Sequence, residues 1–156
     1  MTRAYLAFTE KGLALAQKLA SALPGTVARC GHGGPGLADW AAEQFAHADA
    51  LIFVGAVGIA VRAIAPHCRS KAVDPAVVVL DECGHFAVPI LSGHLGGAND
   101  LARALAAVCG AVPVITTATD ANGVFAVDAW ARHQNCAVLE PGRIKRVSSR
   151  LLAGGP

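Results

Sequence analysis

Residues 74–99, DPAVVVLDECGHFAVPILSGHLGGAN, decide the fold of this chain. Two apolar runs, residues 76–80 and 85–91, flank the four-residue link Asp81-Glu82-Cys83-Gly84. So short a link allows a hairpin but no parallel crossover, so we predict one antiparallel pair of strands inside a mixed sheet. The string Ser92-Gly93-His94-x-Gly96-Gly97-x-Asn99 follows directly. Small polar residues and glycines after an apolar strand are typical of ligand sites in α/β proteins.

The succession of apolar strand, glycine turn and helical period repeats along the rest of the chain. It predicts a mostly parallel, mixed sheet with helices on both faces, an α/β three-layer sandwich. We expect residues 1–120 to form this domain, and 121–156 to be a helical and strand extension packed on it or the start of a middle region. The expected strands are 5–9, 26–30, 50–54, 76–80, 85–91, 112–116 and 136–139, and the expected helices are 10–23, 37–47, 59–65, 94–109, 125–133 and a basic terminal helix opened by Pro141-Gly142.

The composition is that of a folded domain with an apolar core. Of 156 residues, 54% are hydrophobic and 15% are charged, which is far from the composition of disordered chains. The net charge of +2 gives no reason to expect nucleic acid as a partner. Basic residues do crowd the last quarter of the chain, and we interpret them as the solvated face of a helix.

Cysteine usage and hydropathy bear on the compartment. The five cysteines are scattered and never spaced as C-x-x-C, which favours reduced thiols in a cytoplasmic protein over a disulfide framework. The N-terminal residues lack the pattern of a signal peptide. The longest apolar stretch, residues 50–61, is too short to cross a bilayer. We therefore expect a soluble cytoplasmic protein with no membrane partner.

Three polar clusters follow predicted strands: Gly55-x-x-Gly58, Ser92-Gly93-His94, and residues 116–120, TTATD. In an open parallel sheet the carboxyl ends of the strands lie at one edge, where ligands bind. The three clusters can therefore converge on one cleft, although the antiparallel pair leaves open which edge each cluster faces.

The second cluster is expected to open the helix at 94–109. Free N–H groups and the helix dipole at Ser92 or Gly93 would suit a carboxylate, a phosphate or a developing oxyanion. Gly96 and Gly97 would let a ligand approach the backbone closely. The alternative is that Ser92 is only an N-cap and the glycines only allow close packing. His94 is a candidate acid–base group, because imidazole titrates near working pH.

Other polar residues have two interpretations each. Asp81 and Glu82 suit a general base or a solvated hairpin turn. Cys83 and His85 beside Asp81 suggest a metal, but no second ligand pair has zinc-like spacing, so we expect no metal site.

Two basic residues, Arg62 and Lys71, can bind anionic groups or simply lie at the surface. The glycine strings match neither the Walker A motif nor the dinucleotide fingerprint.

Four longer strings carry a family resemblance. They are GAVGIAVRAIAP at 55–66, KxxDPAVVVxDExG at 71–84, LSGHxGGAN at 91–99 and PVITTATD at 113–120. Together they resemble the N-terminal part of the CbiG family, the cobalt-precorrin-5A hydrolases of anaerobic cobalamin biosynthesis. The resemblance covers most of residues 1–140 and is densest between 52 and 120.

The resemblance implies a cobalt-containing, polycarboxylate tetrapyrrole substrate with a δ-lactone. The family opens that lactone and releases a two-carbon unit as acetaldehyde, which gives cobalt-precorrin-5B. Cobalt arrives in the substrate, so no cofactor or protein-bound metal is expected. Family members commonly continue into a C-terminal domain that these 156 residues lack. A separate C-terminal polypeptide, or a second copy of the chain, is therefore a possible partner.

Lactone opening needs an activated water, a stabilised oxyanion and a protonated leaving group. We assign water activation to His94, Asp81 or Glu82, and oxyanion binding to the backbone at 93–97. The residues expected to bind substrate are Gly55, Gly58, Arg62, Lys71, Ser92, Gly93, Gly96, Gly97, Asn99, Thr116, Thr117, Thr119 and Asp120. Two alternatives stay open: a non-catalytic module that binds the tetrapyrrole or a partner, and an α/β domain for another anionic metabolite.

Overall fold

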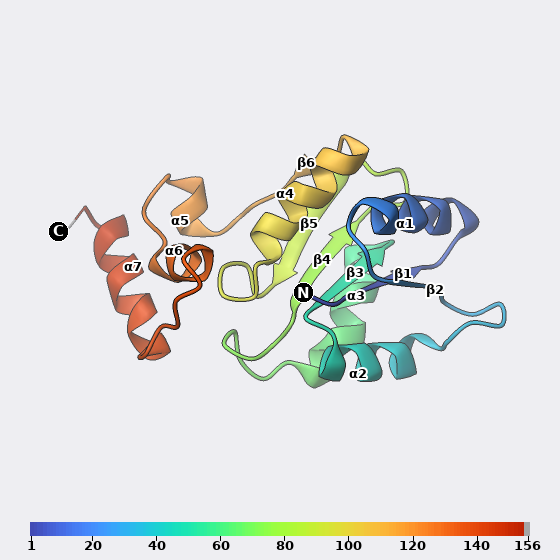
Figure 1. Ribbon diagram of the computed structural model, residues 1–156, viewed down its shortest axis with the longest axis horizontal. Helices are drawn as coiled ribbons and strands as arrows, with labels where there is room; N and C mark the ends of the chain where they lie inside the picture. The colour runs from blue at the N-terminus through green and yellow to red at the C-terminus, as the bar shows by residue number, and fades with distance from the viewer. Residues whose placement is uncertain (155–156) are drawn as a thin grey trace.

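A six-stranded mixed sheet forms the centre of the protein (Figure 1), as seen in a computed structural model that describes residues 1–154. Its strand order is β2-β1-β3-β4-β5-β6. The first four strands run parallel, β5 is antiparallel to β4, and β6 is parallel to β5. The strands are β1 (Arg3–Ala7), β2 (Thr26–Arg29), β3 (Ala50–Val54), β4 (Ala76–Leu80), β5 (Phe86–Leu91) and β6 (Val112–Pro113).

Helices cover both faces of the sheet. The helices of the chain are α1 (Glu10–Ala22), α2 (Leu37–His47), α3 (Val57–Ile64), α4 (Ala98–Cys109), α5 (Ala118–Ala121), α6 (Val127–His133) and α7 (Ile144–Leu152), with short 3-10 turns at Ala65–His67 and Pro141–Arg143. The expected three-layer α/β architecture is confirmed, with α1 and α4 on one face and α2 and α3 on the other.

The alternation of side chains along each strand divides the core into two halves. Tyr5 and Ile52 pack with α1 and α4, whereas Leu6 and Phe53 pack with α2 and α3. Trp40 of α2 meets the Phe53 ring edge-on, with ring centroids 5.4 Å apart. Every residue of β3 and β4 is buried. A strand covered on both faces needs apolar side chains at every position, which explains the uninterrupted apolar runs in the sequence.

The predicted antiparallel pair of β4 and β5 is confirmed, and it divides the strand ends between two edges of the sheet. Val77 pairs with Leu91, and Leu80 pairs with Ala87. The carboxyl ends of β5 and β6 therefore lie at the edge where β1, β3 and β4 begin. The carboxyl ends of the first four strands lie at the opposite edge.

Two predicted boundaries lie more than two residues from those of the structure, and one predicted strand does not form. The helix expected from residue 94 begins at Ala98, because Ser92 and Gly97 have positive φ angles of 54° and 83° and hold the chain in a loop. The strand expected at 112–116 ends at Pro113, and the short helix α5 follows it. Residues 136–139 form no strand, because they lie in a helical lobe beyond the end of the sheet, where no strand edge is available (Figure 1).

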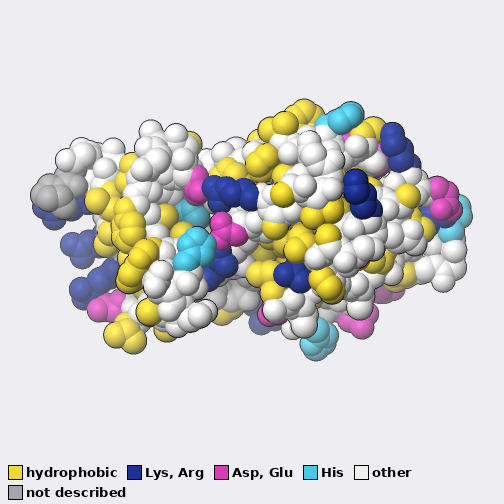
Figure 2. Space-filling view, turned by 45° about the horizontal axis from the view of Figure 1, so that its top comes forward, with side chains coloured by type: hydrophobic (Ala, Val, Ile, Leu, Met, Phe, Trp, Pro, Cys, Tyr) yellow, Lys and Arg dark blue, Asp and Glu magenta, His cyan; other side chains and the backbone are white. Residues whose placement is uncertain are grey.

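That lobe contains α5, α6 and α7. Its small core includes Ala131 of α6 and Ile144 of α7, which are 5% and 4% exposed. Charged and histidine side chains gather where the lobe meets the sheet domain (Figure 2). Within residues 1–154, no helix combines the length and the hydropathy that crossing a bilayer requires.

Candidate active site

A tight loop at 92–97 joins β5 to α4. The Ser92 hydroxyl donates to the backbone carbonyl of Asp74 at 2.9 Å, which ties the loop to the residues before β4. Gly96 packs directly on this serine, since a Cβ added to Gly96 would lie 2.5 Å from the Ser92 Cβ. A side chain at position 96 would therefore push the loop apart.

The start of α4 does not offer the free N–H groups expected there, whereas oxyanion binding by the backbone at 93–97 stays a prediction. The first N–H groups of α4 are occupied, since Ala98 donates to the Ser92 carbonyl at 3.1 Å and Asn99 donates to the Gly93 carbonyl at 3.0 Å. Gly97, and not Ser92, is the N-cap, and it makes no side-chain cap. The loop folds back over the helix start and satisfies its donors with its own carbonyls.

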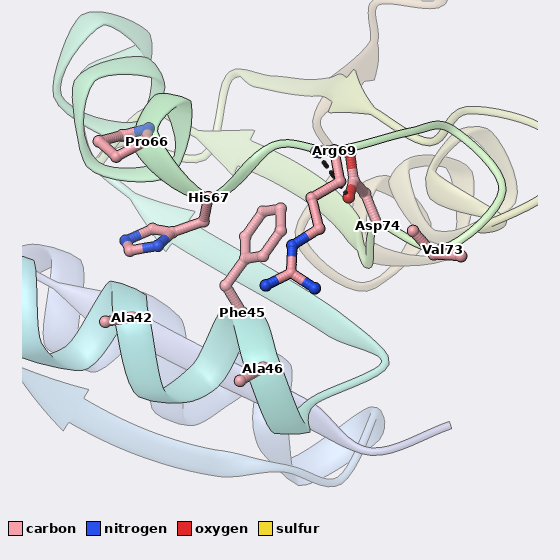
Figure 3. Close-up of a pocket in the computed structure, with 8 residues that line it drawn as sticks. All are labelled: Ala42, Phe45, Ala46, Pro66, His67, Arg69, Val73 and Asp74. Carbon is pink, nitrogen blue, oxygen red and sulfur yellow. Dashed lines mark hydrogen bonds between the residues drawn. The ribbon is translucent and has the colours of Figure 1, made fainter.

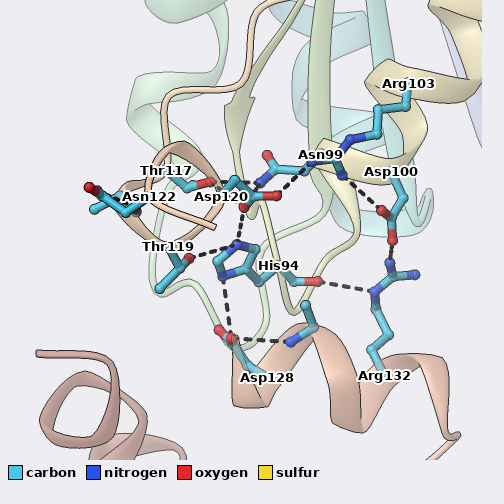
Figure 4. Close-up of polar contacts among 12 residues, drawn as sticks. His94, Asn99, Asp100, Arg103, Thr117, Thr119, Asp120, Asn122, Asp128 and Arg132 are labelled. Atoms are coloured by element: carbon cyan, nitrogen blue, oxygen red, sulfur yellow. Dashed lines mark hydrogen bonds and ion pairs between the residues drawn. The ribbon is translucent and has the colours of Figure 1, made fainter. Parts of the chain in front are cut away.

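The loop presents His94 between two carboxylates (Figure 4). Its Nε2 lies 2.6 Å from Asp120 Oδ2, and its Nδ1 lies 3.3 Å from Asp128 Oδ1. The side chain of His94 is 15% exposed and that of Asp128 only 6%. A protonated imidazole can donate to both carboxylates at once, whereas a neutral ring can donate to only one. The site is therefore built to stabilise the ring after it has accepted a proton.

Asp120 is the centre of this hydrogen-bond network (Figure 4). Besides the His94 contact, its Oδ2 accepts from the Thr117 hydroxyl at 2.6 Å and from the Asn99 amide at 3.1 Å, and its Oδ1 accepts from Arg103 at 2.6 Å. Partial burial acts to raise the pKa of Asp120. Hydrogen bonds from Thr117, His94 and Arg103, with the charge of His94, outweigh it and hold that pKa well below its ordinary value. The carboxylate stays ionised and fixes the ring.

A second set of contacts fixes the lobe to the loop. Arg132 of α6 donates from Nε to the His94 carbonyl at 3.1 Å and forms an ion pair with Asp100 of α4. His133 also contacts Asp100, at 2.7 Å. Because Asp128 lies on the same helix as Arg132, these contacts position the carboxylate beside His94.

A cavity of about 230 Å³ opens beside the His94 ring. It is lined by Lys71, Ser92, Gly93, His94, Leu95, Thr117 and Asp128. The side chains that face it can accept a proton, as His94 and Asp128 can, or bind an anion, as Lys71 can. The Ser92 hydroxyl is already engaged with the Asp74 carbonyl, so we assign it a structural role.

Many of the predicted site residues do meet here. Asn99 is buried and donates to Thr117 at 3.0 Å, and the Thr119 hydroxyl lies 3.4 Å from His94 Nε2. Thr116 is exposed on the segment that leads to α5. The second and third polar clusters of the sequence therefore converge, because β5 and β6 end at the same edge of the sheet.

The first polar cluster and the two hairpin carboxylates do not join them. Gly55 and Gly58 follow β3, and Asp81 and Glu82 follow β4, so all four lie at the opposite edge. Arg62 lines a separate hollow between α2 and α3. The expected convergence of all three clusters is thus wrong. The reason is the reversal of β5, which carries its carboxyl end away from those of β3 and β4.

The two hairpin carboxylates have local partners. Asp81 accepts backbone N–H groups from Cys83, His85 and Phe86 at 2.8–2.9 Å. Partial burial opposes the effect of these bonds on the pKa of Asp81, but the bonds prevail and lower it. Glu82 accepts from the Thr9 hydroxyl at 2.6 Å. These contacts favour the turn-forming interpretation of both residues.

One group of side chains in residues 1–154 has metal-ligating geometry, and it lies at that opposite edge. The ligand atoms of Asp81, Cys83 and His85 fall within 4.8 Å of one another on the exposed β4–β5 hairpin. The His94 site differs, because its two carboxylates face different nitrogens of the ring. Their oxygens cannot join one ring nitrogen on a single ion.

Three residues of the site escaped the sequence analysis: Arg103, Asp128 and Arg132. One feature of the sequence does point to Asp128, because this carboxylate lies three positions before Ala131 on the buried face of α6. Residues three apart share a helix face, and an acidic side chain on an apolar face needs a partner. The two arginines look like any surface cation in the sequence.

The chain resembles known proteins of one kind. Residues 39–120 match the family model described as Cobalamin synthesis G N-terminal. Over 149 residues the chain is 47% identical to a cobalt-precorrin-5A hydrolase of Salmonella typhimurium, and this alignment covers 88% of this chain and 41% of that protein. Over 82 residues it is 48% identical to a cobalt-precorrin-5A hydrolase of Priestia megaterium, and this alignment covers 53% of this chain and 22% of that protein.

A solved structure agrees with the fold. A cobalamin biosynthesis protein G homologue from Sulfolobus solfataricus superposes with a TM-score of 0.63 at 24% identity, over 97% of this chain and 46% of that one. The chain therefore spans less than half the length of these relatives.

Proposed function

The chain belongs to the Cobalamin synthesis G N-terminal family, and we propose that it works as the N-terminal part of a cobalt-precorrin-5A hydrolase. The proposed reaction opens the δ-lactone of cobalt-precorrin-5A and releases acetaldehyde to give cobalt-precorrin-5B. It is a hydrolysis that ends in the cleavage of a carbon–carbon bond. The observation that carries the proposal is the 47% identity to the Salmonella hydrolase over nearly the whole of this chain.

His94 is the proposed acid–base group. Asp120 Oδ2, 2.6 Å from Nε2, holds a proton on that nitrogen and leaves Nδ1, on the side of Asp128 and the cavity, as the basic nitrogen. Nδ1 takes a proton from water as the water oxygen attacks the lactone carbonyl. The ring then returns this proton to the alkoxide as the lactone C–O bond breaks. Asp128, 3.3 Å from Nδ1, stabilises the imidazolium between the two transfers.

The same nitrogen serves the second step. Lactone opening leaves a carboxylate and a free hydroxyl on the two-carbon unit. Nδ1 of His94 removes the hydroxyl proton, the carbon–carbon bond breaks, and its electron pair passes to the macrocycle carbon, which is then protonated. The two-carbon unit leaves as acetaldehyde. A base that gains and loses a proton in turn suits a ring placed between two carboxylates.

Lys71 is the proposed anion-binding group of the cavity. Its side chain is exposed, and it makes no ion pair within 4 Å among residues 1–154. An ammonium there can attract a substrate carboxylate or the oxyanion of the tetrahedral intermediate. We propose no protein cofactor, because cobalt is carried by the substrate. A cytoplasmic location suits the five cysteines, all of which are free thiols.

A second candidate function follows from length. The Salmonella hydrolase is more than twice as long as the region matched by this chain. The chain can therefore be a half that binds the tetrapyrrole or a partner polypeptide, while turnover needs further residues. Both candidate functions involve the same tetrapyrrole, and they differ in whether the chain converts it without further residues.

Acetaldehyde release tests the proposal. The purified chain is incubated with cobalt-precorrin-5A, and acetaldehyde is followed through NADH oxidation by alcohol dehydrogenase. His94→Gln is compared with His32→Gln, a substitution in an exposed loop remote from the site. We expect release by the wild type and by His32→Gln, and strongly reduced release by His94→Gln.

The other outcomes separate the candidates. Release only after the remaining part of a hydrolase is added identifies the chain as a half enzyme. No release with that part present, together with no binding of the tetrapyrrole, would overturn the proposal and favour another anionic metabolite.

A further inference from the structure

A larger hollow lies at the same edge of the sheet as His94. It opens between the last turns of α2 and the segment 65–74 that leads into β4, and its volume is about 380 Å³ (Figure 3). Small-molecule sites typically measure roughly 300–1,000 Å³. Such sites combine apolar and aromatic side chains with a few polar groups, and this hollow is lined by side chains of each kind.

One wall of the hollow is an aromatic pair. The rings of Phe45 and His67 lie 5.8 Å apart between centroids and are tilted by 38°. Figure 3 shows the Phe45 ring between His67 and the guanidinium of Arg69. Aromatic side chains of this kind can contact the apolar surface of a bulky ligand.

The polar group is Arg69. It is exposed, and no carboxylate lies within 4 Å of its guanidinium in the part of the chain that the structure describes. The nearby carboxylate of Asp74 is 7% exposed and accepts the backbone N–H of Arg69 at 3.0 and 3.1 Å, so it is used to fix the segment. A planar guanidinium with free donors is suited to a carboxylate ligand.

This hollow is linked to the candidate active site through shared lining residues. A neighbouring hollow of about 590 Å³ shares Phe45 and Asp74 with it and extends to Gly96 and Arg132, at the loop that carries His94. Asp49 also lines that second hollow, but its carboxylate accepts the Thr2 N–H at 2.6 Å. Two residues after Arg69 in the same segment, Lys71 lines the His94 cavity. The segment 65–74 therefore supplies one cation, Arg69, to the larger hollow and another, Lys71, to the His94 cavity.

We propose that Arg69 and the Phe45–His67 pair form a second substrate subsite, which binds a carboxylate-bearing edge of the tetrapyrrole while His94 acts on another edge. The inference rests on the proposed function, because it takes the tetrapyrrole as the ligand. It adds a residue that sets substrate affinity without touching the reacting atoms. Loss of its charge should weaken binding and leave proton transfer at His94 unchanged.

Binding of stable corrinoids tests this subsite without turnover. Cobyrinic acid carries seven free carboxylates, and its heptamethyl ester carries none. Isothermal titration of the wild-type chain should show binding of the acid and much weaker binding of the ester. Arg69→Gln should weaken binding of the acid about tenfold, as the loss of one charge-assisted contact predicts. Lys18→Gln, an exposed charge on α1 across the sheet, should leave it unchanged.

Kinetics supply the second readout. With cobalt-precorrin-5A, Arg69→Gln should raise KM about tenfold and change kcat less than twofold. Affinity for cobyrinic acid equal to that of the wild type would overturn the subsite. A large fall in kcat without a change in KM would also overturn it, since Arg69 would then act in the chemistry. Failure of the wild type to bind any corrinoid, together with no acetaldehyde release when the remaining part of a hydrolase is present, would instead refute the proposed function.

Discussion

Asp120→Asn should destabilise the protein at neutral pH. Asp120 Oδ2 accepts hydrogen bonds from Thr117, Asn99 and His94, and Oδ1 accepts one from Arg103. An asparagine that keeps its oxygen at the first position turns its NH₂ toward Arg103. It loses that ion pair and the charge assistance of the other bonds. Hydrogen bonds to charged groups contribute about 1.5–3 kcal/mol, and Arg103 is half exposed, so we expect a net loss of about 2 kcal/mol.

The pH dependence of this loss has a definite sign. The pKa of Asp120 is lower in the folded protein than the ordinary value of about 3.9. The wild type therefore has the full stabilisation above that value and loses it as the pH falls toward the folded pKa. A group that stays ionised when folded loses about 0.7 kcal/mol by pH 3.5. Asp120→Asn removes the titrating carboxylate, so the difference in unfolding free energy between the wild type and the variant should narrow between pH 5 and pH 3.5.

Urea unfolding followed by circular dichroism measures both quantities. The loss is first measured at neutral pH, and its pH dependence is then measured from pH 5 to pH 3.5, below the titration of unfolded imidazoles near pH 6.5. Asp39→Asn, an exposed acid in the first turn of α2, serves as the matched control and should change stability by less than about 0.5 kcal/mol. A loss for Asp120→Asn no larger than the control's would show that the Asp120 network contributes no stability. A difference that widens toward pH 3.5 would contradict the lowered pKa of Asp120.

Three further predictions concern the loop, the opposite edge and metals. Gly96→Ala should lower the unfolding midpoint in urea, because its Cβ would lie 2.5 Å from that of Ser92, and an unchanged midpoint would contradict the tight loop. Gly58→Ala should keep wild-type acetaldehyde release and raise stability by about 0.5 kcal/mol, since nothing lies within 4 Å of the added Cβ on helix α3; lost activity would return Gly58 to the site. Dialysis against EDTA should leave the rate of acetaldehyde release unchanged, and a loss restored by Zn²⁺ would show that a protein-bound metal takes part.

Strand and helix positions in the sheet domain could be predicted because burial leaves a strong pattern. β3 and β4 are apolar at every position, and the four-residue link could only be a hairpin. The hairpin also contained the information that β5 ends at the edge opposite to β4. That geometric consequence separates His94 from Asp81 and is incompatible with the predicted convergence of all three polar clusters.

The rest depended on contacts between distant segments. The start of α4 was misplaced because the positive φ angles of Ser92 and Gly97 come from the folded loop, and a run of small residues before a helical period looks like a cap. Asp128 lies 34 positions after His94 in the sequence. Its role depends on the packing of the lobe against the His94 loop through Arg132, and no local sequence pattern predicts that packing.

We propose that the chemistry takes place at His94, at the edge where β5 ends. The most direct test is the single-turnover rate of acetaldehyde release from cobalt-precorrin-5A, measured for His94→Gln and Glu82→Gln with any required partner polypeptide present. General acid–base catalysis contributes about 100-fold to 10,000-fold, so His94→Gln should be at least about 100-fold slower. Glu82→Gln, at the opposite edge, should stay within about twofold of the wild type. A wild-type rate for His94→Gln, or an equal loss for Glu82→Gln, would contradict the account.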